Sequence, residues 1–591
     1  MARRSVRLLS EAIAAVASDD HDEGLDLVIL PPEGGDQQVS DTEFGDEDNL
    51  ESIQSLPTET AGTLEIHTAA DVDDGPAGPS GAGPSKLTGR PSARTTRASD
   101  VPRWRARPEI EPMEGQELPA FPTGHPELQS KTPIEVFRMY WDDQLCNMII
   151  TETNRYARQN NDQVFQLTRE ELDQFLGIMF LTGYVSLPRQ RMYWEKGEDV
   201  NVPVIGKTMP RNRFELIKRY LHFADNEHLP TGDKIAKVRP LFEELNRVLL
   251  QFGVIHPQLS IDEQMVPYFG RHSSKMFMKG KPVRFGFKLW VLASSDGYPY
   301  QVEMYAGKNT GPGEGRAGCE SLGLGGDVVL RLLECLQTPA QHHVFFDNYF
   351  SSYALMIALR QRGIRATGTV RDNRLKKCPL PDNKTAEKAP RGQHWYQSTN
   401  GVLAVKWRDN RAVTVVTNHS GISPLKDVQR WSGDEKRKVT VKQPNLIYEY
   451  NQYMGGVDLV DGAVAAYRPV IRWKKWYGTL VTNAFGLLRV ASWRMYRSCT
   501  GRSVDQLEFT REVALELLKN PRQEPCPPNV TGSGPGPSSG RVTVVSRTAQ
   551  NHFIVPAATQ GRCKLCQKNT RTMCSICQVR LHNHCSQNYH T

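Results

Sequence analysis

The stretch HHVFFDNYFSS (342–352) places three apolar residues directly before an aspartate. An apolar run this short, bounded by polar residues, predicts a β-strand that is buried on both faces. Helical patterns precede it at 327–337 and follow it at 351–363, where Gly363 is the kind of residue that commonly ends a helix. Asp347 is therefore expected at the carboxyl end of a buried strand, the edge where sites assemble in α/β sheets.

Other strand-like segments flank this unit. LSIDEQMVPYFG, RFGFKLWVLASS and YPYQVEMYAG begin at Leu259, Arg284 and Tyr298, and Ser295–Gly297 between the last two is a hairpin signal. A further strand, IRATGTVR, begins at Ile364. Three antiparallel strands followed by alternating helices and strands predict an α/β fold with a mixed sheet and helices packed against it.

Three further aspartates are candidates for the same edge of the sheet. Asp262 lies in the first strand, and Asp458 and Asp461 follow a double glycine and lie one helical turn apart, so both point to one side. Converging carboxylates raise one another's pKa unless cations compensate them. Oxygen ligands favour Mg²⁺ or Mn²⁺, and a pair of such ions can hold the attacking and leaving oxygens around a phosphorus atom.

Each of these aspartates also fits an ordinary structural role. Asp347 is compatible with a turn or helix N-cap, and Asp262 with a solvated edge residue. Asp458 and Asp461 suit the positive end of a helix dipole.

Charge is distributed unevenly along the chain. Residues 11–80 contain 19 Asp and Glu and no Lys or Arg; because residues 1–10 contribute +3 and the whole chain carries +7, residues 81–591 carry +23. This excess favours a polyanionic partner, most simply nucleic acid, although a generally basic surface also fits. No apolar run approaches the ~18 residues that span a bilayer. We therefore expect no membrane partner and a cytosolic or nuclear protein.

Composition divides the chain into regions. Residues 1–105 are acidic and poor in aromatic residues, a composition typical of disorder. In the helical region that follows, Thr168 and Thr208 are expected N-caps. The remaining predicted regions are a helical part (106–258), the first part of the sheet core (259–375), a β-rich insertion (376–440), the last part of the core (441–464), a second helical part (465–523), a flexible linker (524–548) and a cysteine-rich module (549–591).

Two basic segments are candidates for DNA contact. In YRPVIRWKKWYG (467–478), cations can neutralise phosphates and tryptophans can stack on a distorted strand end. The same pattern fits a solvated basic face whose tryptophans anchor the following helix. RHSSKMFMKGKPVR (271–284) places a second basic stretch beside Asp262. The candidate DNA-binding residues are Arg468, Arg472, Trp473, Lys474, Lys475 and Trp476.

Cysteines crowd the end of the chain, which favours metal binding in a reducing compartment over a disulfide framework. Two C-x-x-C pairs followed by His and Cys at short spacing predict zinc, and so short a segment would take its folding energy from the metal. Alternate pairing gives two Zn²⁺ sites in a cross-brace, although a single zinc with spare cysteines also fits. The first ligand set is Cys563, Cys566, His582 and Cys585; the second is Cys574, Cys577, His590 and either His552 or His584.

A series of motifs resembles the piggyBac-type DDE transposases, a family that includes vertebrate piggyBac-derived proteins. In order, from about residue 130 to 500, the motifs are NRYARQ, RQRMYWE, RFELIKRYLHFADN, DKIAKVRPLF, SIDEQMVPYFGR, KPVRFGFKLW, FFDNYFSS, RATGTVR and YNQYMGGVDLVD, and the cysteine-rich tail shares the resemblance. By this resemblance Asp262, Asp347 and Asp458 match the family's catalytic triad, Asp461 matches a further aspartate important for activity, and His552 is favoured as the eighth zinc ligand.

The resemblance further implies an RNase H-like catalytic core with a β-rich insertion, flanked by a split helical domain for dimerisation and DNA binding. It implies a nuclear homodimer that moves DNA by cut-and-paste at TTAA sites through hairpinned transposon ends, and a zinc finger that helps recognise the end repeats. Two other functions stay open: a domesticated DNA-binding or chromatin-associated protein without catalytic activity, and a protein-interaction adaptor that uses the zinc finger and the acidic segment.

Overall fold

The computed structural model of the 591-residue chain consists of two compact units. Unit 1 combines Met1–Thr132, Leu245–Tyr467 and Trp473–Gln506, whereas unit 2 combines Pro133–Glu244, Arg468–Arg472 and Leu507–Thr591. The structure describes residues 102–111, 113–119, 121, 125–278, 281, 283–307, 321–433, 435–519, 554–574, 579–582 and 585, and the backbone of three short strands at 5–6, 25–29 and 64–68. Within these ranges, every helix is too short or too polar to span a bilayer.

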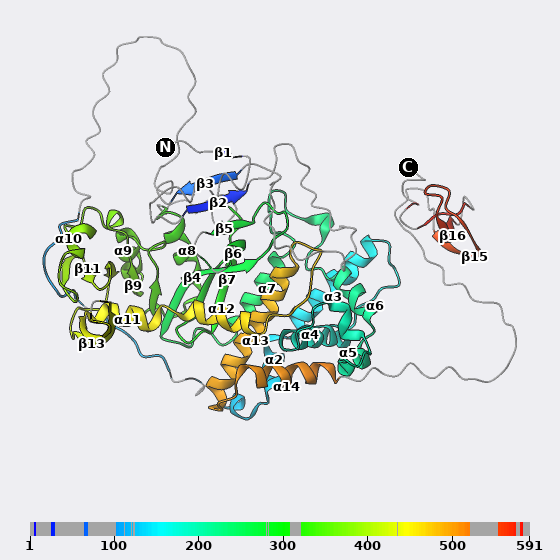
Figure 1. Cartoon of the computed structure of the whole chain (residues 1–591), viewed down its shortest axis with the longest axis horizontal. Helices are drawn as coiled ribbons and strands as arrows, with labels where there is room; N and C mark the ends of the chain where they lie inside the picture. Colours follow the sequence, from blue (N-terminus) through cyan, green and yellow to red (C-terminus); the bar gives the residue numbers. More distant parts are fainter. Residues whose placement is uncertain are drawn as a thin grey trace, which may run out of the picture. The chain divides into compact units, whose positions relative to one another are not determined.

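The core of unit 1 is a mixed sheet of 12 strands (Figure 1). Neighbouring strands follow the order β1-β3-β2-β5-β6-β4-β8-β9-β12-β11-β10, and β7 pairs with β6. β4 is antiparallel to β6 and parallel to β8, which is parallel to β9, so the predicted mixed sheet is confirmed. The central strands are β4 (Gln258–Pro267), β5 (Met276–Met278), β6 (Phe285–Ser294), β7 (Pro299–Met304), β8 (His343–Phe346) and β9 (Arg365–Thr369).

Local sequence accounts for these strands. Every residue of β6 and of β8 is buried, as a strand enclosed between neighbouring strands and covering helices requires. The predicted hairpin between β6 and β7 is present, and Gly297 in its turn has a φ of +88°, which only glycine adopts without strain.

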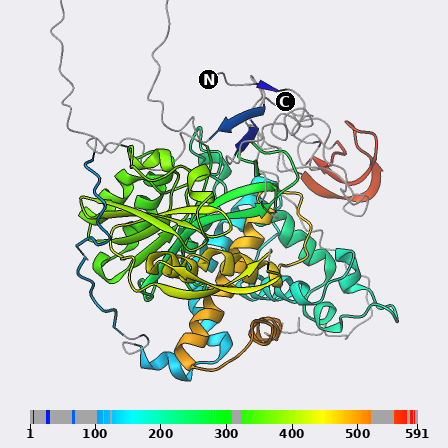
Figure 2. The ribbon, with the colours of Figure 1, turned by 60° about the vertical axis from the view of Figure 1, so that its left-hand side comes forward.

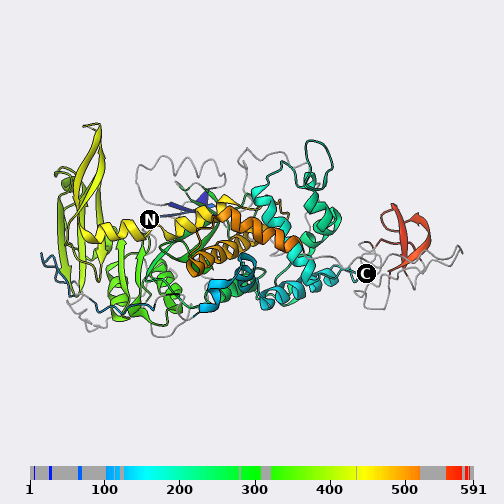
Figure 3. The same ribbon diagram turned by 90° about the horizontal axis from the view of Figure 1, so that it is seen from below.

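Helices lie on both faces of the sheet (Figures 2 and 3). Ser352 caps the N-terminus of α9 by accepting a hydrogen bond from the Leu355 N–H, and Gly363 follows its C-terminus at a φ of +73°. The helices of unit 1 are α8 (Leu324–Leu332), α9 (Tyr353–Gln361), α10 (Asn383–Glu387), α11 (Asn445–Tyr453), α12 (Gly456–Ala466) and α13 (Gly478–Thr500), and α7 (Arg239–Leu249) crosses the boundary between the units.

The first residue of α12 touches the sheet directly. A Cβ atom on Gly456 would lie 2.1 Å from the carbonyl oxygen of Ser294 and 2.5 Å from Oγ of Ser260. Only a glycine permits this approach, which sets the height of α12 above β4.

Helix α13 lies in unit 1, and the domain boundary predicted at residue 465 stays a prediction. Its buried residues lie all round the helix and not along one stripe, so it is enclosed by other elements. It contacts α12, β4 and β7, which are all in unit 1. The second helical segment of unit 2 therefore begins at Leu507.

The segment predicted as an insertion extends the central sheet. β12 (Ala412–Thr417) pairs antiparallel with β9, and β11 (Val402–Arg408) and β10 (His394–Thr399) follow. β13 (Lys426–Ser432) and β14 (Arg437–Gln443) form a separate two-stranded sheet, here called the basic ribbon. Strands β10, β11 and β12 are thus continuous with the core sheet, because β12 pairs with the edge of β9.

Three strands lie within 1–105, the segment expected to be disordered. β2 (Leu25–Ile29) pairs with β5 and β3 (Leu64–Thr68), and β1 (Ser5–Val6) pairs with β3. The apolar sequence LDLVI of β2 is a suitable strand former, which the composition of the whole segment conceals. The other residues before 102 lie outside the described part, so their disorder stays a prediction.

Unit 2 contains a helical body. Thr168 caps α4 as predicted, accepting a hydrogen bond from the Glu171 N–H. The prediction for Thr208 is wrong: it is the last residue of α5, and Pro210 is the N-cap of α6, since the proline begins a new helix. The helices are α2 (Pro133–Tyr140), α3 (Asp143–Gln159), α4 (Arg169–Tyr184), α5 (Pro203–Thr208), α6 (Arg211–Tyr220) and α14 (Gln506–Leu518).

The cysteine-rich module contains the strands β15 (Ile554–Arg562) and β16 (Asn569–Cys574), which pair antiparallel. Among the residues described there, the buried hydrophobic cluster consists only of Ile554, Leu581 and three cysteines. Such a core is too small to stabilise a fold by apolar burial alone.

Candidate active site and metal centre

The pairing of β4 with β8 brings the first two predicted aspartates together. Their parallel register ends at Ile261 beside Phe346, so the next residues along the two strands are Asp262 and Asp347. Neighbours in register point to the same face of a sheet. Asp347 also accepts a hydrogen bond from the Tyr349 N–H and thus occupies a turn, as the alternative interpretation expected.

Glu263 completes a group of three carboxylates with Asp262 and Asp347. One oxygen from each lies within 4.8 Å of the others, and all three residues are partly buried. Sequence reasoning missed Glu263, because strict alternation along a strand sends the residue after Asp262 to the other face. The feature of the sequence that could have indicated Glu263 is its position directly after Asp262, in the acidic pair Asp-Glu.

The electrostatics of the group indicate uncompensated negative charge. Burial, followed by the charges of Glu263 and Asp347, raises the pKa of Asp262 well above its usual value. Burial and the charge of Glu263 raise the pKa of Asp347 to about 6. For Glu263 burial acts upwards, but the ammonium groups of Lys288 and Lys281 outweigh it and lower the pKa.

The two lysines are fixed beside the carboxylates. Lys281 Nζ lies 3.0 Å from Oε1 of Glu263. Lys288 is 2% exposed, and its Nζ lies 4.0 Å from the ring centroid of Trp290 and 4.7 Å from that of Tyr349. Three carboxylates thus face two ammonium groups. Oxygen donors and surplus negative charge in a partly buried site fit a hard divalent cation such as Mg²⁺ or Mn²⁺.

Helix α12 carries Asp458 and Asp461 over the same face of β4. Gly456 touches Ser260, and the Asp461 carboxylate accepts a hydrogen bond from the side chain of Gln264. Ser260, Asp262 and Gln264 alternate along β4 and therefore share one face. Asp458 lies between the two contacts, above the part of β4 that carries Asp262.

The two helix aspartates differ in their surroundings. Asp458 is exposed in the first turn of α12 and interacts electrostatically with Lys281, which also neighbours Asp262. Asp461 is half-buried, and its partner Gln264 also accepts a hydrogen bond from Asn483 of α13. Neither belongs to the group of three within 4.8 Å, among the residues that the structure describes.

The tryptophans of the segment 467–478 pack against other residues: Trp476 is buried and Trp473 is half-buried. Trp476 is 6% exposed and stacks on His272 with 3.9 Å between ring centroids. Trp473 donates a hydrogen bond to Thr482, and a Cβ atom on Gly478 would lie 2.1 Å from its ring. These contacts anchor the start of α13, as the alternative interpretation of the segment expected.

The cations of this segment differ in exposure. Arg472 and Lys474 are exposed, Arg468 is half-buried and Lys475 is buried. Their role in binding DNA stays a prediction. In the other basic stretch, Arg271 and Arg284 are exposed, whereas Lys275 is buried and donates to the Gly270 carbonyl.

The C-terminal module brings together the first predicted zinc ligand set. Ligand atoms of Cys563, Cys566, His582 and Cys585 all lie within 4.8 Å of one another. His582 Nδ1 is 3.3 Å from Sγ of Cys566, while its Nε2 lies 3.1 Å from the Asn569 carbonyl oxygen. That contact suits a tautomer with the proton on Nε2, in which Nδ1 carries the lone pair that can bind a metal.

Backbone groups favour a thiolate at this site. Burial acts to raise the pKa of Cys563, but hydrogen bonds from the backbone, the Cys566 N–H first among them, lower it to about 6. A set of three sulfurs and one imidazole nitrogen fits a tetrahedral zinc ion. Of the second set only Cys574 is described, buried in β16; Cys577, His590, His552 and His584 lie outside the described residues.

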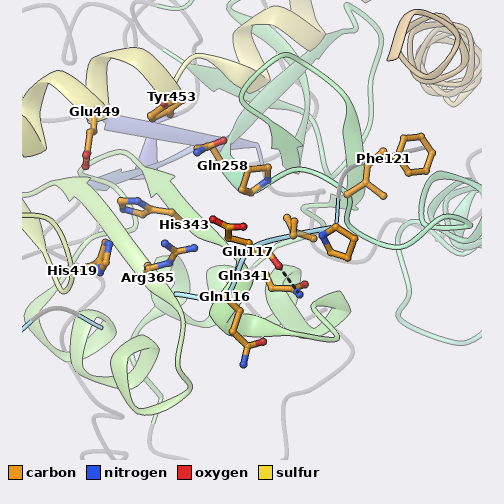
Figure 4. A pocket seen from close by; sticks show the side chains of 14 residues that line it. Gln116, Glu117, Phe121, Gln258, Gln341, His343, Arg365, His419, Glu449 and Tyr453 are labelled. Atoms are coloured by element: carbon orange, nitrogen blue, oxygen red, sulfur yellow. Dashed lines mark hydrogen bonds between the residues drawn. The ribbon is translucent and has the colours of Figure 1, made fainter. Parts of the chain in front are cut away.

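A cavity of about 560 Å³ lies at the other end of the parallel strands (Figure 4). Its lining includes the first residues of β4, β8 and β9, which are Gln258, His343 and Arg365. The carboxylates follow the last paired residues of β4 and β8, so the cavity is separate from them. None of the site residues predicted from the sequence lines it.

Comparisons with known proteins agree on one family. The sequence model of a family described as "Transposase IS4" matches residues 132–493. The chain is 37% identical over 606 residues to PiggyBac transposable element-derived protein 3 of Homo sapiens, with 99% of each chain covered. It is 33% identical over 583 residues to PiggyBac transposable element-derived protein 2 of Homo sapiens, covering 95% of this chain and 93% of that one.

A solved structure has a similar fold. The cryo-EM structure of the piggyBac transposase synaptic complex with hairpin DNA matches with a TM-score of 0.56 at 18% identity. The match covers 79% of this chain and 99% of that one. At this level of identity the similarity concerns the fold alone.

Proposed function

The chain belongs to the piggyBac transposase family, and on this basis we propose that it is a DNA transposase that cuts and joins DNA by metal-dependent phosphodiester hydrolysis and strand transfer. The observation that carries the proposal is the group of three carboxylates at the ends of β4 and β8, with Asp458 above it on α12. Two of the three, Asp262 and Asp347, have raised pKa values, which fits carboxylates that a divalent cation would compensate.

The catalytic core is RNase H-like. Three antiparallel strands (β7, β6 and β4) followed by two parallel strands (β8 and β9), with helices in the connections, support this assignment. The acidic residues then lie in β4, at the end of β8 and in α12, the helix that covers β4.

Asp262, Asp347 and Asp458 are the residues that would hold Mg²⁺ or Mn²⁺, and Asp461 would support them from the next turn of α12. A pair of such ions, when bound, stabilises the charge on the attacking and leaving oxygens of a phosphate. Lys281 keeps Glu263 paired, and Lys288 sits as a fixed positive charge between two aromatic rings. The ion pair orients the Glu263 carboxylate before any substrate arrives.

The substrate is double-stranded DNA, namely transposon end repeats and TTAA target sites, processed through hairpinned ends by a nuclear homodimer. The excess of +23 over residues 81–591 supports a polyanionic substrate. The solved structure with a similar fold is a synaptic complex with hairpin DNA, which supports the hairpin route by analogy. Exposed Arg472 and Lys474 are suited to phosphate contacts.

The C-terminal module is a cross-brace zinc finger with two Zn²⁺ ions. The first ion would be held by the four residues that cluster in the structure. The second would be held by Cys574, Cys577, His590 and either His552, which the family resemblance favours, or His584, and the finger would contribute to recognition of the end repeats.

The test is cleavage of DNA that carries TTAA-flanked candidate ends from the genome of origin. Purified full-length protein is incubated with Mg²⁺ or without added divalent cation, beside an Asp347→Asn variant. Nicks and hairpins that require both Mg²⁺ and Asp347 are the expected result. Binding of the correct ends without any cleavage would instead identify a domesticated DNA-binding protein.

A further inference from the structure

The basic ribbon, formed by β13 and β14, has one packed face and one free face. Val428 and Val439 pack against a buried cluster that includes Leu403, Val405 and Trp407. Burial alternates along β13, with every second residue exposed. The ribbon is therefore fixed on the core of unit 1 through one face and presents the other to solvent (Figure 3, yellow strands).

The free face carries three cross-strand pairs. Asp427 opposes Lys442, Gln429 opposes Thr440, and Trp431 opposes Lys438. The first pair forms an ion pair of 2.8 Å and the second a hydrogen bond of 2.9 Å, so the polar groups of both pairs already have partners within the ribbon. The third pair consists of an aromatic ring that is 60% exposed and an exposed ammonium group. Most of the Trp431 side chain is therefore not packed against the protein and is accessible to a ligand.

Backbone and side-chain contacts hold Trp431 in place. The guanidinium of Arg391 donates a 2.8 Å hydrogen bond to the Trp431 carbonyl. Arg391 and the neighbouring Arg430 both pair with Asp409, which ties the ribbon to the turn after β11. The ring is thus presented from a rigid strand, so little conformational entropy is lost when a ligand stacks on it.

The charge around the ring is positive. Residues 426–442 contain six Lys and Arg against three Asp and Glu. Asp427 and Glu435 are already paired with Lys442 and Arg437. Lys438 has no ion-pair or hydrogen-bond partner among the described residues, which leaves its ammonium group available beside Trp431.

We propose that the free face of the basic ribbon binds single-stranded or unpaired DNA, with Trp431 stacking on a base and Lys438 neutralising an adjacent phosphate. An exposed ring beside cations is the combination that single-strand-binding surfaces use, because every base has a π-face and every linkage a charge. A protein partner would favour a broader apolar patch, whereas the other residues of this face are polar or charged. The proposal goes beyond the proposed function, since it concerns binding and holds whether or not the carboxylates cleave DNA.

The test uses full-length protein without added Mg²⁺, so that no cleavage intervenes. Two probes share one duplex; one is blunt and the other carries an unpaired tail containing 2-aminopurine. Trp431→Ala should weaken binding to the tailed probe by about 5-fold to 150-fold, the loss of one base stack. Binding to the blunt probe should change by less than about 2-fold, and quenching of the 2-aminopurine should be lost.

Matched variants separate stacking from charge and from folding. Gln429→Ala removes a neighbouring side chain from the same face and should leave both probes bound normally. Trp431→Phe should retain more affinity than Trp431→Leu, because leucine offers apolar surface without a π-face. Lys438→Ala should lower the slope of log affinity against log salt by about 0.7 on single strands.

Unchanged affinity of Trp431→Ala for the tailed probe, with the thermal midpoint also unchanged, would overturn the proposal and reassign the ribbon to a partner that is not DNA. Equal affinities for the Phe and Leu variants would overturn the stacking role even if Trp431→Ala proved unstable. Failure of the cleavage test for the proposed function has no bearing on either result.

Discussion

The carboxylate group and the Cys/His group are both sets of candidate metal ligands, but their members come together in opposite ways. Asp262 and Asp347 are distant in sequence and become neighbours because β4 and β8 pair in parallel register. Cys563, Cys566 and Cys585 lie in one short segment with few buried residues. Strand pairing positions the carboxylates, whereas a module this small would need a bound metal to fold.

Removal of zinc should produce the largest difference between the two sites. Zinc binding supplies on the order of 10–16 kcal/mol to small zinc modules, so a zinc chelator should unfold the C-terminal segment. The thermal midpoint of the sheet core should shift by less than about 2 °C, because its carboxylates are held by strand pairing. Limited proteolysis with mass spectrometry reports the first effect and calorimetry the second.

Two cysteine variants provide the control for this comparison. Cys566→Ser should reproduce the effect of the chelator, because Cys566 lies in the ligand group. Cys378→Ser, in the insertion, should leave the module protected. A module that stays resistant to protease after complete loss of zinc would contradict the dependence.

Replacement of Asp347 should abolish activity without loss of stability. Asp347→Asn removes a charge from the carboxylate group and should reduce cleavage by at least about 10³-fold, equivalent to about 4 kcal/mol. The thermal midpoint should be unchanged or higher, because burial already raises the pKa of Asp347 to about 6 and its charge is unfavourable there.

The matched control is Asp199→Asn, which changes an exposed aspartate in unit 2 and should keep wild-type activity. Cleavage by Asp347→Asn at more than a tenth of the wild-type rate would remove this residue from the catalytic site. A large fall in its thermal midpoint would show that the carboxylate stabilises the sheet instead.

Substitution of Gly456 tests whether the close packing of α12 on the sheet contributes to stability. Gly456→Ala would place a Cβ atom 2.1 Å from the Ser294 carbonyl oxygen, and overpacking of this kind costs about 1–3 kcal/mol. Gly462→Ala changes the same helix where no atom lies within 4 Å of the new Cβ, and should stabilise by up to about 1 kcal/mol. In chemical denaturation the free energy of unfolding should fall for Gly456→Ala and rise for Gly462→Ala. Equal changes would contradict the direct packing of α12 on β4.

The pairing of Asp262 with Asp347 was predictable in outline, since an apolar run that stops at a carboxylate marks a strand end. The Cys/His set was predictable in detail, because ligand spacing on a tight turn is a local property. Packing of Trp473 and Trp476 was not predictable, since the same basic and aromatic sequence suits a surface or an anchor. Only tertiary contacts, such as the stack of Trp476 on His272, decide between the two.

Glu263 was also hidden from the sequence. Alternation along β4 predicts that Asp262 and Glu263 point apart, and the strand register keeps their backbones regular. Glu263 pairs with Trp290 and therefore shares the face of β6 that carries Lys288, whose charge, with that of Lys281, acts on its carboxylate. One oxygen of Glu263 nevertheless lies within 4.8 Å of oxygens of Asp262 and Asp347, beside the end of β8. The charges of other segments act on this position, and they do not follow from local pattern.

Glu263→Gln gives the smallest and most informative of these effects. Loss of its charge should raise the Mg²⁺ concentration for half-maximal cleavage by about 10-fold to 100-fold, the range for residues that orient metal ligands. The maximal rate at saturating Mg²⁺ should fall much less, which distinguishes Glu263 from Asp347. Glu263→Asp keeps the charge and should retain part of the Mg²⁺ affinity that Glu263→Gln loses. Glu303→Gln is the control: it breaks an ion pair with Arg331 elsewhere in the sheet and should leave the Mg²⁺ requirement unchanged. An unchanged Mg²⁺ requirement would mean that Glu263 serves only to hold Lys281 and does not orient the metal ligands.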